Sequence, residues 1–173
     1  KCFTHAFSCD NDKGMQDVIR NNRETTFLCE DIQELGRLFV TNIHDPHSLE
    51  KRVLPWSGWN FTGWTCVDYS DLNDWKKASQ NESGQSRQTL EGWLKYLDIH
   101  KPPYATGEIT FNVKRAPSTI FFDDDDEPVT VHDEAVSRMR QSNYVVAHRE
   151  CCPLSDCKVP QSRRRVIYMM VNA

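Results

Sequence analysis

The chain has 173 residues, a length that suits one domain and leaves little room for a second. Its 21 lysines and arginines against 25 aspartates and glutamates give a formal charge of −4, which excludes a histone-like or polybasic protein that binds by bulk charge but leaves a local basic site open. No apolar run approaches the roughly 20 residues that a membrane helix needs, and the seven irregularly spaced cysteines indicate a reduced, intracellular protein rather than a disulfide scaffold.

The first third of the chain predicts the strand–helix–strand order of a parallel sheet. Residues 3–9 are a short apolar run that ends in acids, residues 13–22 carry apolar side chains at helical spacing, and residues 25–29 form a second apolar run closed by acids. Residues 36–59 contain two prolines and are expected to be mostly connection.

The remaining segments continue the alternation of strands and helices. The clearest helix is predicted over residues 85–100, where four large apolar side chains share one face and two prolines follow the end. The run of acids at 123–127 is expected to be a solvated loop. Strands are predicted at 60–67, 104–113, 144–148 and 166–171, the last two as a pair, and a helix at 133–140. The pattern indicates a single α/β domain over residues 1–173.

Two isolated residues have positions suited to chemistry. Cys66 stands at the end of an apolar strand, before a polar turn, where open α/β sheets bind ligands and where a thiol can act as a nucleophile. A buried structural cysteine is an equally weighted alternative. Glu108 interrupts an apolar strand, where a carboxyl group is costly unless it is paired or protonated, so it is a candidate proton donor. Its alternative is an edge-strand glutamate that faces water.

The segment at 159–166 carries three consecutive arginines. On an extended chain Gln161, Arg163 and Arg165 point to one side and Arg164 points to the other. The side chains on one side form a fork that suits a carboxylate, a phosphate or the edge of a base. A solvated basic patch is the plainer interpretation.

Taken in order, these segments resemble the C5-cytosine DNA methyltransferases. Residues 65–70 (TCVDYS) resemble the nucleophile motif of that family, and Glu108, preceded by two prolines and four residues, stands where its Glu-Asn-Val motif begins. The Gln-x-Arg-x-Arg motif is matched fully by Gln161, Arg163 and Arg165. Upstream, Asp10 resembles the acid that holds the cofactor ribose, and residues 29–32 resemble the segment that meets the adenine.

The resemblance implies a Rossmann-like, S-adenosylmethionine-dependent methyltransferase fold, with a mostly parallel sheet flanked by helices and incomplete at the N-terminus. It implies methyl transfer to C5 of a flipped-out cytosine in DNA, with Cys66 attacking C6 and Glu108 bonding N3. Arg163, Arg165 and Gln161 would steady the base. S-adenosylmethionine would bind at Asp10, Asp31 and Ile32.

The chain also departs from that family. Thr65 replaces a proline, and Ile109 and Thr110 replace the asparagine and valine of the Glu-Asn-Val motif. The glycine-rich cofactor turn and the target-recognition region have no counterpart, so a partial or degenerate catalytic domain is expected. A catalytically inactive subunit of a larger assembly is therefore the main alternative. An RNA cytosine-5 methyltransferase is a minor one, because Thr65 and Cys66 resemble its catalytic dipeptide.

The expected partners are DNA and S-adenosylmethionine, with other protein subunits as a further option and no membrane. The nucleus is the expected compartment, and an organelle is the alternative. No metal is expected, although His148, Cys151, Cys152 and Cys157 lie within ten residues. Adjacent cysteines seldom bind one zinc ion together, and the separated pairs of a usual zinc site are missing.

Overall fold

The computed structural model describes residues 4–22, 25–45, 47, 49–65, 84–115, 117–122, 125, 127–158 and 163–173. The chain divides into two compact units. Unit 1 comprises residues 1–58 and 91–102, and unit 2 comprises residues 59–90 and 103–173. We describe each unit by itself, and the assignment of residues 1–173 to one methyltransferase-like domain stays an expectation.

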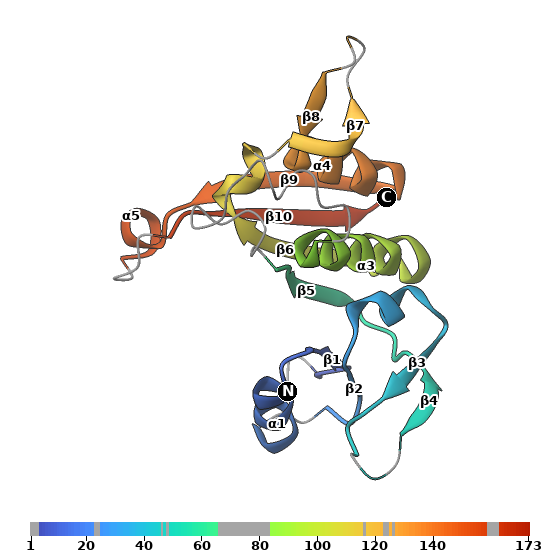
Figure 1. Cartoon of the computed structure of the whole chain (residues 1–173). Helices are drawn as coiled ribbons and strands as arrows, with labels where there is room; N and C mark the ends of the chain where they lie inside the picture. The colour runs from blue at the N-terminus through green and yellow to red at the C-terminus, as the bar shows by residue number, and fades with distance from the viewer. Residues whose placement is uncertain are drawn as a thin grey trace. The chain divides into compact units, whose positions relative to one another are not determined.

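Unit 1 begins with the predicted strand–helix–strand order. Strands β1 (Ser8–Cys9) and β2 (Leu28–Cys29) pair in parallel (Figure 1). Helix α1 (Lys13–Asn22) connects them in the sequence and has the predicted bounds. Ile19 of α1 packs with buried Leu28 and Ile43 in a small core, whereas Met15 and Val18 of the same helix are exposed. A 3-10 helix, η1 (Ile32–Gly36), follows β2.

The prediction that residues 36–59 are mostly connection was wrong. They contain an antiparallel hairpin of β3 (Phe39–Asn42) and β4 (Glu50–Val53). Only β3 alternates between buried and exposed residues, whereas all of β4 is exposed and carries three charged side chains. A solvated edge strand lacks the apolar pattern that identifies strands, which explains why the sequence did not show it.

Unit 2 contains a four-stranded mixed sheet in the order β5-β6-β10-β9. Strands β5 (Trp59–Gly63) and β6 (Tyr104–Thr110) are parallel, while β10 (Arg165–Asn172) runs antiparallel to both β6 and β9 (Tyr144–Cys151). The α/β fold and the pairing of the last two strands are confirmed. The sheet is partly rather than mostly parallel, because β10 follows β9 without a crossover helix of the length that a parallel connection needs.

One helix of unit 2, α4, packs against this sheet. Helix α3 (Gln85–His100) has the predicted bounds, and its first six residues belong to unit 2. Helix α4 (Val131–Gln141) contacts β9, and alternate residues of β10 are buried, namely Val166, Tyr168 and Met170. The predicted strand at 104–113 ends early, because residues 111–114 form a 3-10 helix, η3 (Phe111–Lys114).

The run of acids lies between two strands that the sequence did not predict. Strands β7 (Pro117–Phe122) and β8 (Pro128–Thr130) form an antiparallel hairpin, and Asp125 and Glu127 between them are exposed (Figure 1). A short helix, α5 (Pro153–Cys157), follows β9.

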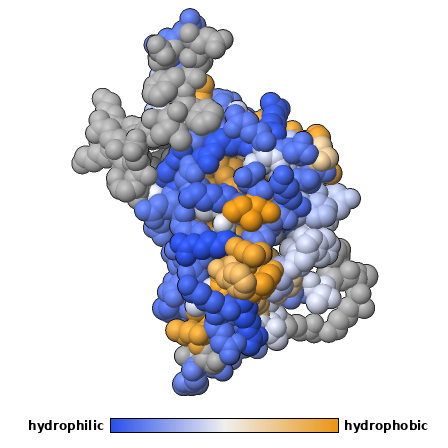
Figure 2. Space-filling model, turned by 90° about the vertical axis from the view of Figure 1, so that its right-hand side faces the viewer, coloured by the Kyte–Doolittle hydropathy of each residue, from blue (hydrophilic) through white to orange (hydrophobic). Residues whose placement is uncertain are grey.

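Charged and polar side chains dominate the face of the molecule in Figure 2, where apolar side chains form small separate groups. Within the described ranges, no helix has the length and apolar character required to cross a membrane.

Candidate active site

Three of the predicted catalytic segments meet at one edge of the sheet in unit 2. The parallel strands β5 and β6 end at this edge, and the antiparallel strand β10 begins there. Gly63 is the last residue of β5, Glu108 lies near the end of β6, and Arg165 is the first residue of β10. The strand directions therefore bring together residues that are about 100 positions apart in the sequence.

Glu108 and Arg165 form an ion pair between a carboxylate oxygen, Oε1, and the guanidinium Nε. Glu108 is opposite Ile167 and Arg165 is opposite Thr110, so the two charged residues are diagonal neighbours on one face of the sheet. Their side chains are 44% and 22% exposed, respectively, which places the pair at the rim of the core. The pair explains how an apolar strand accommodates a carboxylate, because the guanidinium offsets the cost of desolvation.

The missing side chain of Gly63 leaves space beside this carboxylate. A Cβ atom added at Gly63 would lie 3.5 Å from Oε2 of Glu108, the oxygen on the side away from the ion pair. The next residue, Trp64, donates its backbone N–H to the carbonyl oxygen of Glu108 at 3.2 Å. The chain that leads to Cys66 is thus anchored to the backbone of Glu108 two residues before the predicted nucleophile.

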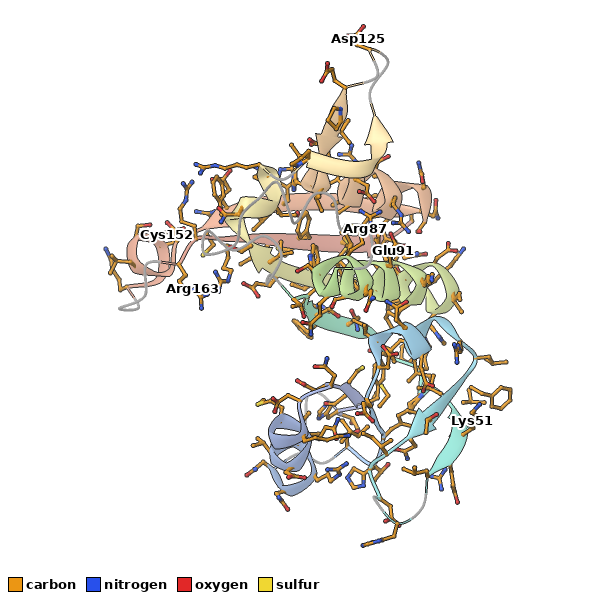
Figure 3. All side chains as sticks on the ribbon, viewed as in Figure 1. Lys51, Arg87, Glu91, Asp125, Cys152 and Arg163 are labelled. Atoms are coloured by element: carbon orange, nitrogen blue, oxygen red, sulfur yellow. The ribbon has the colours of Figure 1, made fainter. Side chains whose placement is uncertain are left out.

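Cys66 and Gln161 themselves lie outside the described residues. Arg163 is exposed, and within the described part of the chain it makes no ion pair. In Figure 3, Cys152 and Arg163 lie where β9 ends and β10 begins, which is the end of these strands at which the site lies. The structure therefore places Glu108 and Arg165 in contact and leaves Arg163 accessible to a ligand.

A buried group beneath the site escaped the sequence analysis. The ring of Trp64 stacks on Tyr168 with centroids 5.4 Å apart, and the Tyr168 hydroxyl and Nδ1 of buried His132 share a 2.7 Å hydrogen bond. Burial raises the pKa of Tyr168, and burial together with nearby His148 lowers the pKa of His132 to about 4. Both groups are therefore neutral at physiological pH and hold Trp64 by packing and hydrogen bonding.

The predicted cofactor residues lie together in unit 1. Asp10 and Asp31 follow the parallel strands β1 and β2, so both lie at the carboxyl edge of the pair, and the N–H of Asp10 donates to the Cys29 carbonyl at 3.1 Å. One carboxylate oxygen of Asp10 accepts the N–H of Asp12, and one of Asp31 accepts the N–H of Gln33, each at 2.9 Å. These bonds fix the carboxylates while each keeps a second oxygen, an acceptor that suits a ribose hydroxyl or an adenine amino group.

The pKa of the Cys9 thiol depends on both of these acids. Its pKa is raised first by the adjacent Cys29 thiol, then by burial, and further by the negative charges of Asp31 and Asp10. Both carboxylates thus contribute to the raised pKa of one thiol of β1. Ile32 begins η1 and is half-buried, which gives the same edge an apolar side chain for a flat ring. The residues present fit the nucleoside half of S-adenosylmethionine.

In the part of the chain that the structure describes, no three His, Cys, Asp or Glu side chains are grouped to hold a metal ion.

The sequence has a relative among curated proteins, although no protein-family model matches the chain. Over 120 residues, 66% of this chain, it is 29% identical to the DNA (cytosine-5-)-methyltransferase DMT5 of Cryptococcus neoformans var. grubii. The chain is related to the C5-cytosine methyltransferases.

Two solved methyltransferase structures have a fold similar to that of this chain. The Dnmt2 methyltransferase of S. pombe superimposes with a TM-score of 0.59 over 97% of this chain, at 12% identity. The methyltransferase EhMeth of Entamoeba histolytica superimposes with a TM-score of 0.51 over the whole chain, at 16% identity. The chain spans 4% of the curated relative and 43% and 54% of the two structures.

Proposed function

We propose that this chain supplies the reaction edge of an enzyme that transfers a methyl group from S-adenosylmethionine to C5 of cytosine in DNA. The observation that carries the proposal is the ion pair of Glu108 and Arg165 beside Gly63, at the strand end that leads to Cys66. It rests also on the relation to a cytosine-5 methyltransferase. A C5 transfer needs a nucleophile and an acid group on the same base. In this proposal Glu108 is the acid group, and Cys66, three residues after Gly63 in the sequence, is the nucleophile.

The proposed chemistry begins with a cytosine flipped out of the duplex so that C6 faces the thiolate of Cys66. Addition of sulfur to C6 moves the electrons of the C5–C6 double bond toward C5, which becomes nucleophilic. Glu108, with a proton on Oε2, donates a hydrogen bond to N3 and stabilises the negative charge developing in the ring. Arg165 orients Glu108 through their ion pair, and Arg163 is available to the base or its phosphate.

S-adenosylmethionine, held at Asp10, Asp31 and Ile32, supplies the activated methyl group. After transfer, a water molecule takes the C5 proton, whose bonding electrons restore the C5–C6 double bond and expel the Cys66 thiolate. The methyl group thereby replaces one proton on the ring, S-adenosylmethionine would leave as the neutral thioether, and the side chains return to their initial states.

Covalent trapping on a duplex that contains 5-fluorocytosine tests the proposal. Fluorine at C5 cannot leave as a proton would, so the adduct through Cys66 should persist in denaturing gels only when S-adenosylmethionine is present. Cys66→Ser should abolish the adduct. Cys152→Ser is the matched control, because Cys152 is a second accessible thiol whose pKa is lowered by hydrogen bonds from Ser155.

Parallel reactions with DNA and RNA duplexes identify the substrate. An adduct on DNA alone supports the proposal as stated, whereas an adduct on RNA alone supports the minor alternative. Calorimetry with S-adenosylmethionine, with Asp10→Ala and Asp31→Ala as variants, tests the cofactor residues separately. Binding of the cofactor without an adduct on either nucleic acid would overturn the enzyme and favour an inactive subunit.

A further inference from the structure

The middle arginine of the Gln-x-Arg-x-Arg segment, Arg164, has no role in the proposed reaction. Its guanidinium carbon lies 3.9 Å from the centroid of the Phe111 ring, and its Nη2 atom donates to a carboxylate oxygen of Glu150 at 2.8 Å. The backbone reinforces this contact, because the N–H of Phe111 donates to the carbonyl of Arg164 at 3.2 Å. Arg164 is therefore held in a defined place on the side of the strand opposite to Arg165.

A second arginine uses the same aromatic ring. The guanidinium carbon of Arg115, which follows η3, lies 5.3 Å from the Phe111 centroid. Cations over an aromatic face are attracted by the ring quadrupole, so Phe111 holds two like charges near each other. The side chain of Arg164 is 51% exposed and Arg115 is exposed as well, so both guanidinium groups keep donors available to solvent.

The charges around Phe111 do not cancel. Glu150 accepts from Lys114 at 2.9 Å and from Arg164 at 2.8 Å, and the hydrogen bond from Lys114 is the main cause that lowers the pKa of Glu150. One carboxylate thus serves two cations, and within the described residues Arg115 pairs with no acid. Three cations against one anion leave a local charge of about +2 on a chain whose formal charge is −4.

We infer that Lys114, Arg115 and Arg164, arranged on Phe111, form a cradle for the phosphodiester backbone of a nucleic acid. A guanidinium fork matches the geometry of phosphate oxygens, and its stacking on Phe111 reduces the entropy lost on binding. Phe111 comes three residues after Glu108, and Arg164 precedes Arg165, so the cradle adjoins the reaction edge. The inference rests on the proposed function for its choice of polyanion.

Salt-dependent binding to a duplex without cytosine isolates this contact from catalysis. The probe is a fluorescein-labelled 20-base-pair poly(dA)·poly(dT) duplex, titrated by fluorescence anisotropy without S-adenosylmethionine. The double variant Arg115→Gln, Arg164→Gln should lower the slope of log affinity against log salt by about 2, because each phosphate contact contributes roughly 0.9. Between 0.05 and 0.2 M salt, the wild-type chain should lose about tenfold more affinity than this variant.

Arg140→Gln is the matched control for charge. Arg140 is exposed and belongs to the same unit, but it lies in α4, before β9 begins, whereas Glu150 lies near the end of β9. It should leave the slope unchanged. Phe111→Leu keeps both arginines, so it should weaken binding while the slope stays near the wild-type value. Circular dichroism melts of every variant check that the fold is kept.

An unchanged slope in the double variant, an equal loss in Arg140→Gln, or no binding by the wild-type chain at 0.05 M salt would overturn the cradle. An RNA duplex of matching sequence, run in parallel, shows which nucleic acid supplies the phosphates. The outcome of the trapping experiment is independent of this binding experiment. If the wild-type chain binds the A/T duplex but forms no adduct, the proposed methyl transfer is overturned and the cradle is kept. If the double variant forms the adduct and binds the duplex with unchanged affinity, the methyl transfer is kept and the cradle is overturned.

Discussion

Replacing Glu134 by glutamine should destabilise unit 2 more than any other single loss of charge discussed for this chain. Glu134 is fully buried in α4, and its two carboxylate oxygens accept from the two terminal nitrogens of Arg87 at 2.6 Å each. Ser118 of β7 donates to the same carboxylate at 2.7 Å, and Arg138 lies 3.4 Å away. Three elements, α3, α4 and β7, are therefore joined at one buried anion.

The expected cost follows from what is left behind. Glutamine preserves the size of the side chain but removes the charge, so Arg87, whose side chain is only 11% exposed, loses the negative charge of its Glu134 partner. Breaking a buried pair on one side costs about 3–5 kcal/mol, whereas the free energy of unfolding of a whole domain is about 5–15 kcal/mol. At about 2–4 °C per kcal/mol, the melting temperature should fall by roughly 6–20 °C.

Urea denaturation followed by circular dichroism measures this change, because urea is uncharged and does not screen ion pairs. The matched control is Glu150→Gln. Glu150 also binds two cations, Lys114 and Arg164, but its side chain is 38% exposed and water replaces the lost partner. Glu134→Gln should shift the urea midpoint several times further than Glu150→Gln. Equal shifts would show that burial does not set the strength of these pairs, and the reasoning would be refuted.

Three further changes have defined outcomes. Since burial lowers the pKa of His132 from 6.5 to about 4, protonation favours the unfolded chain, and the free energy of unfolding should fall by roughly 2–3 kcal/mol between pH 6.5 and 4. Urea titrations across pH should show this slope, and His132→Phe should lack it. Gly92→Ala would place a Cβ atom 2.9 Å from the Ile32 carbonyl oxygen, so it should cost about 1–3 kcal/mol and weaken S-adenosylmethionine binding in calorimetry. Thr130→Ala removes the oxygen that caps α4 by accepting from Asp133, and thermal melting should show a loss of about 1 kcal/mol; no change would contradict the cap.

The sequence predicted the elements whose pattern is local. Helix α3 has the predicted bounds because its apolar side chains recur at helical spacing and two prolines prevent its continuation. Helix α4 was predicted two residues short at its start, where Thr130 caps the helix before the apolar pattern begins. The hairpins escaped because their edge strands are exposed or flank a run of acids. Local periodicity does not report strands that bury little surface.

For the candidate site, the sequence predicted the residue types but not their contacts. The prediction that Glu108 must be paired or protonated needed only its apolar neighbours, whereas its partner, Arg165, comes from a strand 57 residues later. Burial of Glu134 was unforeseen, because a glutamate on a helix is usually solvated and only the tertiary fold supplies Arg87. The burial of Tyr168 between Val166 and Met170 could have been found from the alternation of β10.

Net charge is a poor guide to what this chain binds, because its charges are sorted by position. Unit 1 presents acids after β1 and β2, which suit a nucleoside that offers hydroxyl and amino donors. The end of β6 and the start of β10 carry the cations Lys114, Arg115 and Arg164 next to the Glu108 ion pair, which suit a phosphodiester. A cation excess on one rim steers a polyanion toward that rim even when the whole chain is acidic, since screening confines each field to about 10 Å at 0.1 M salt.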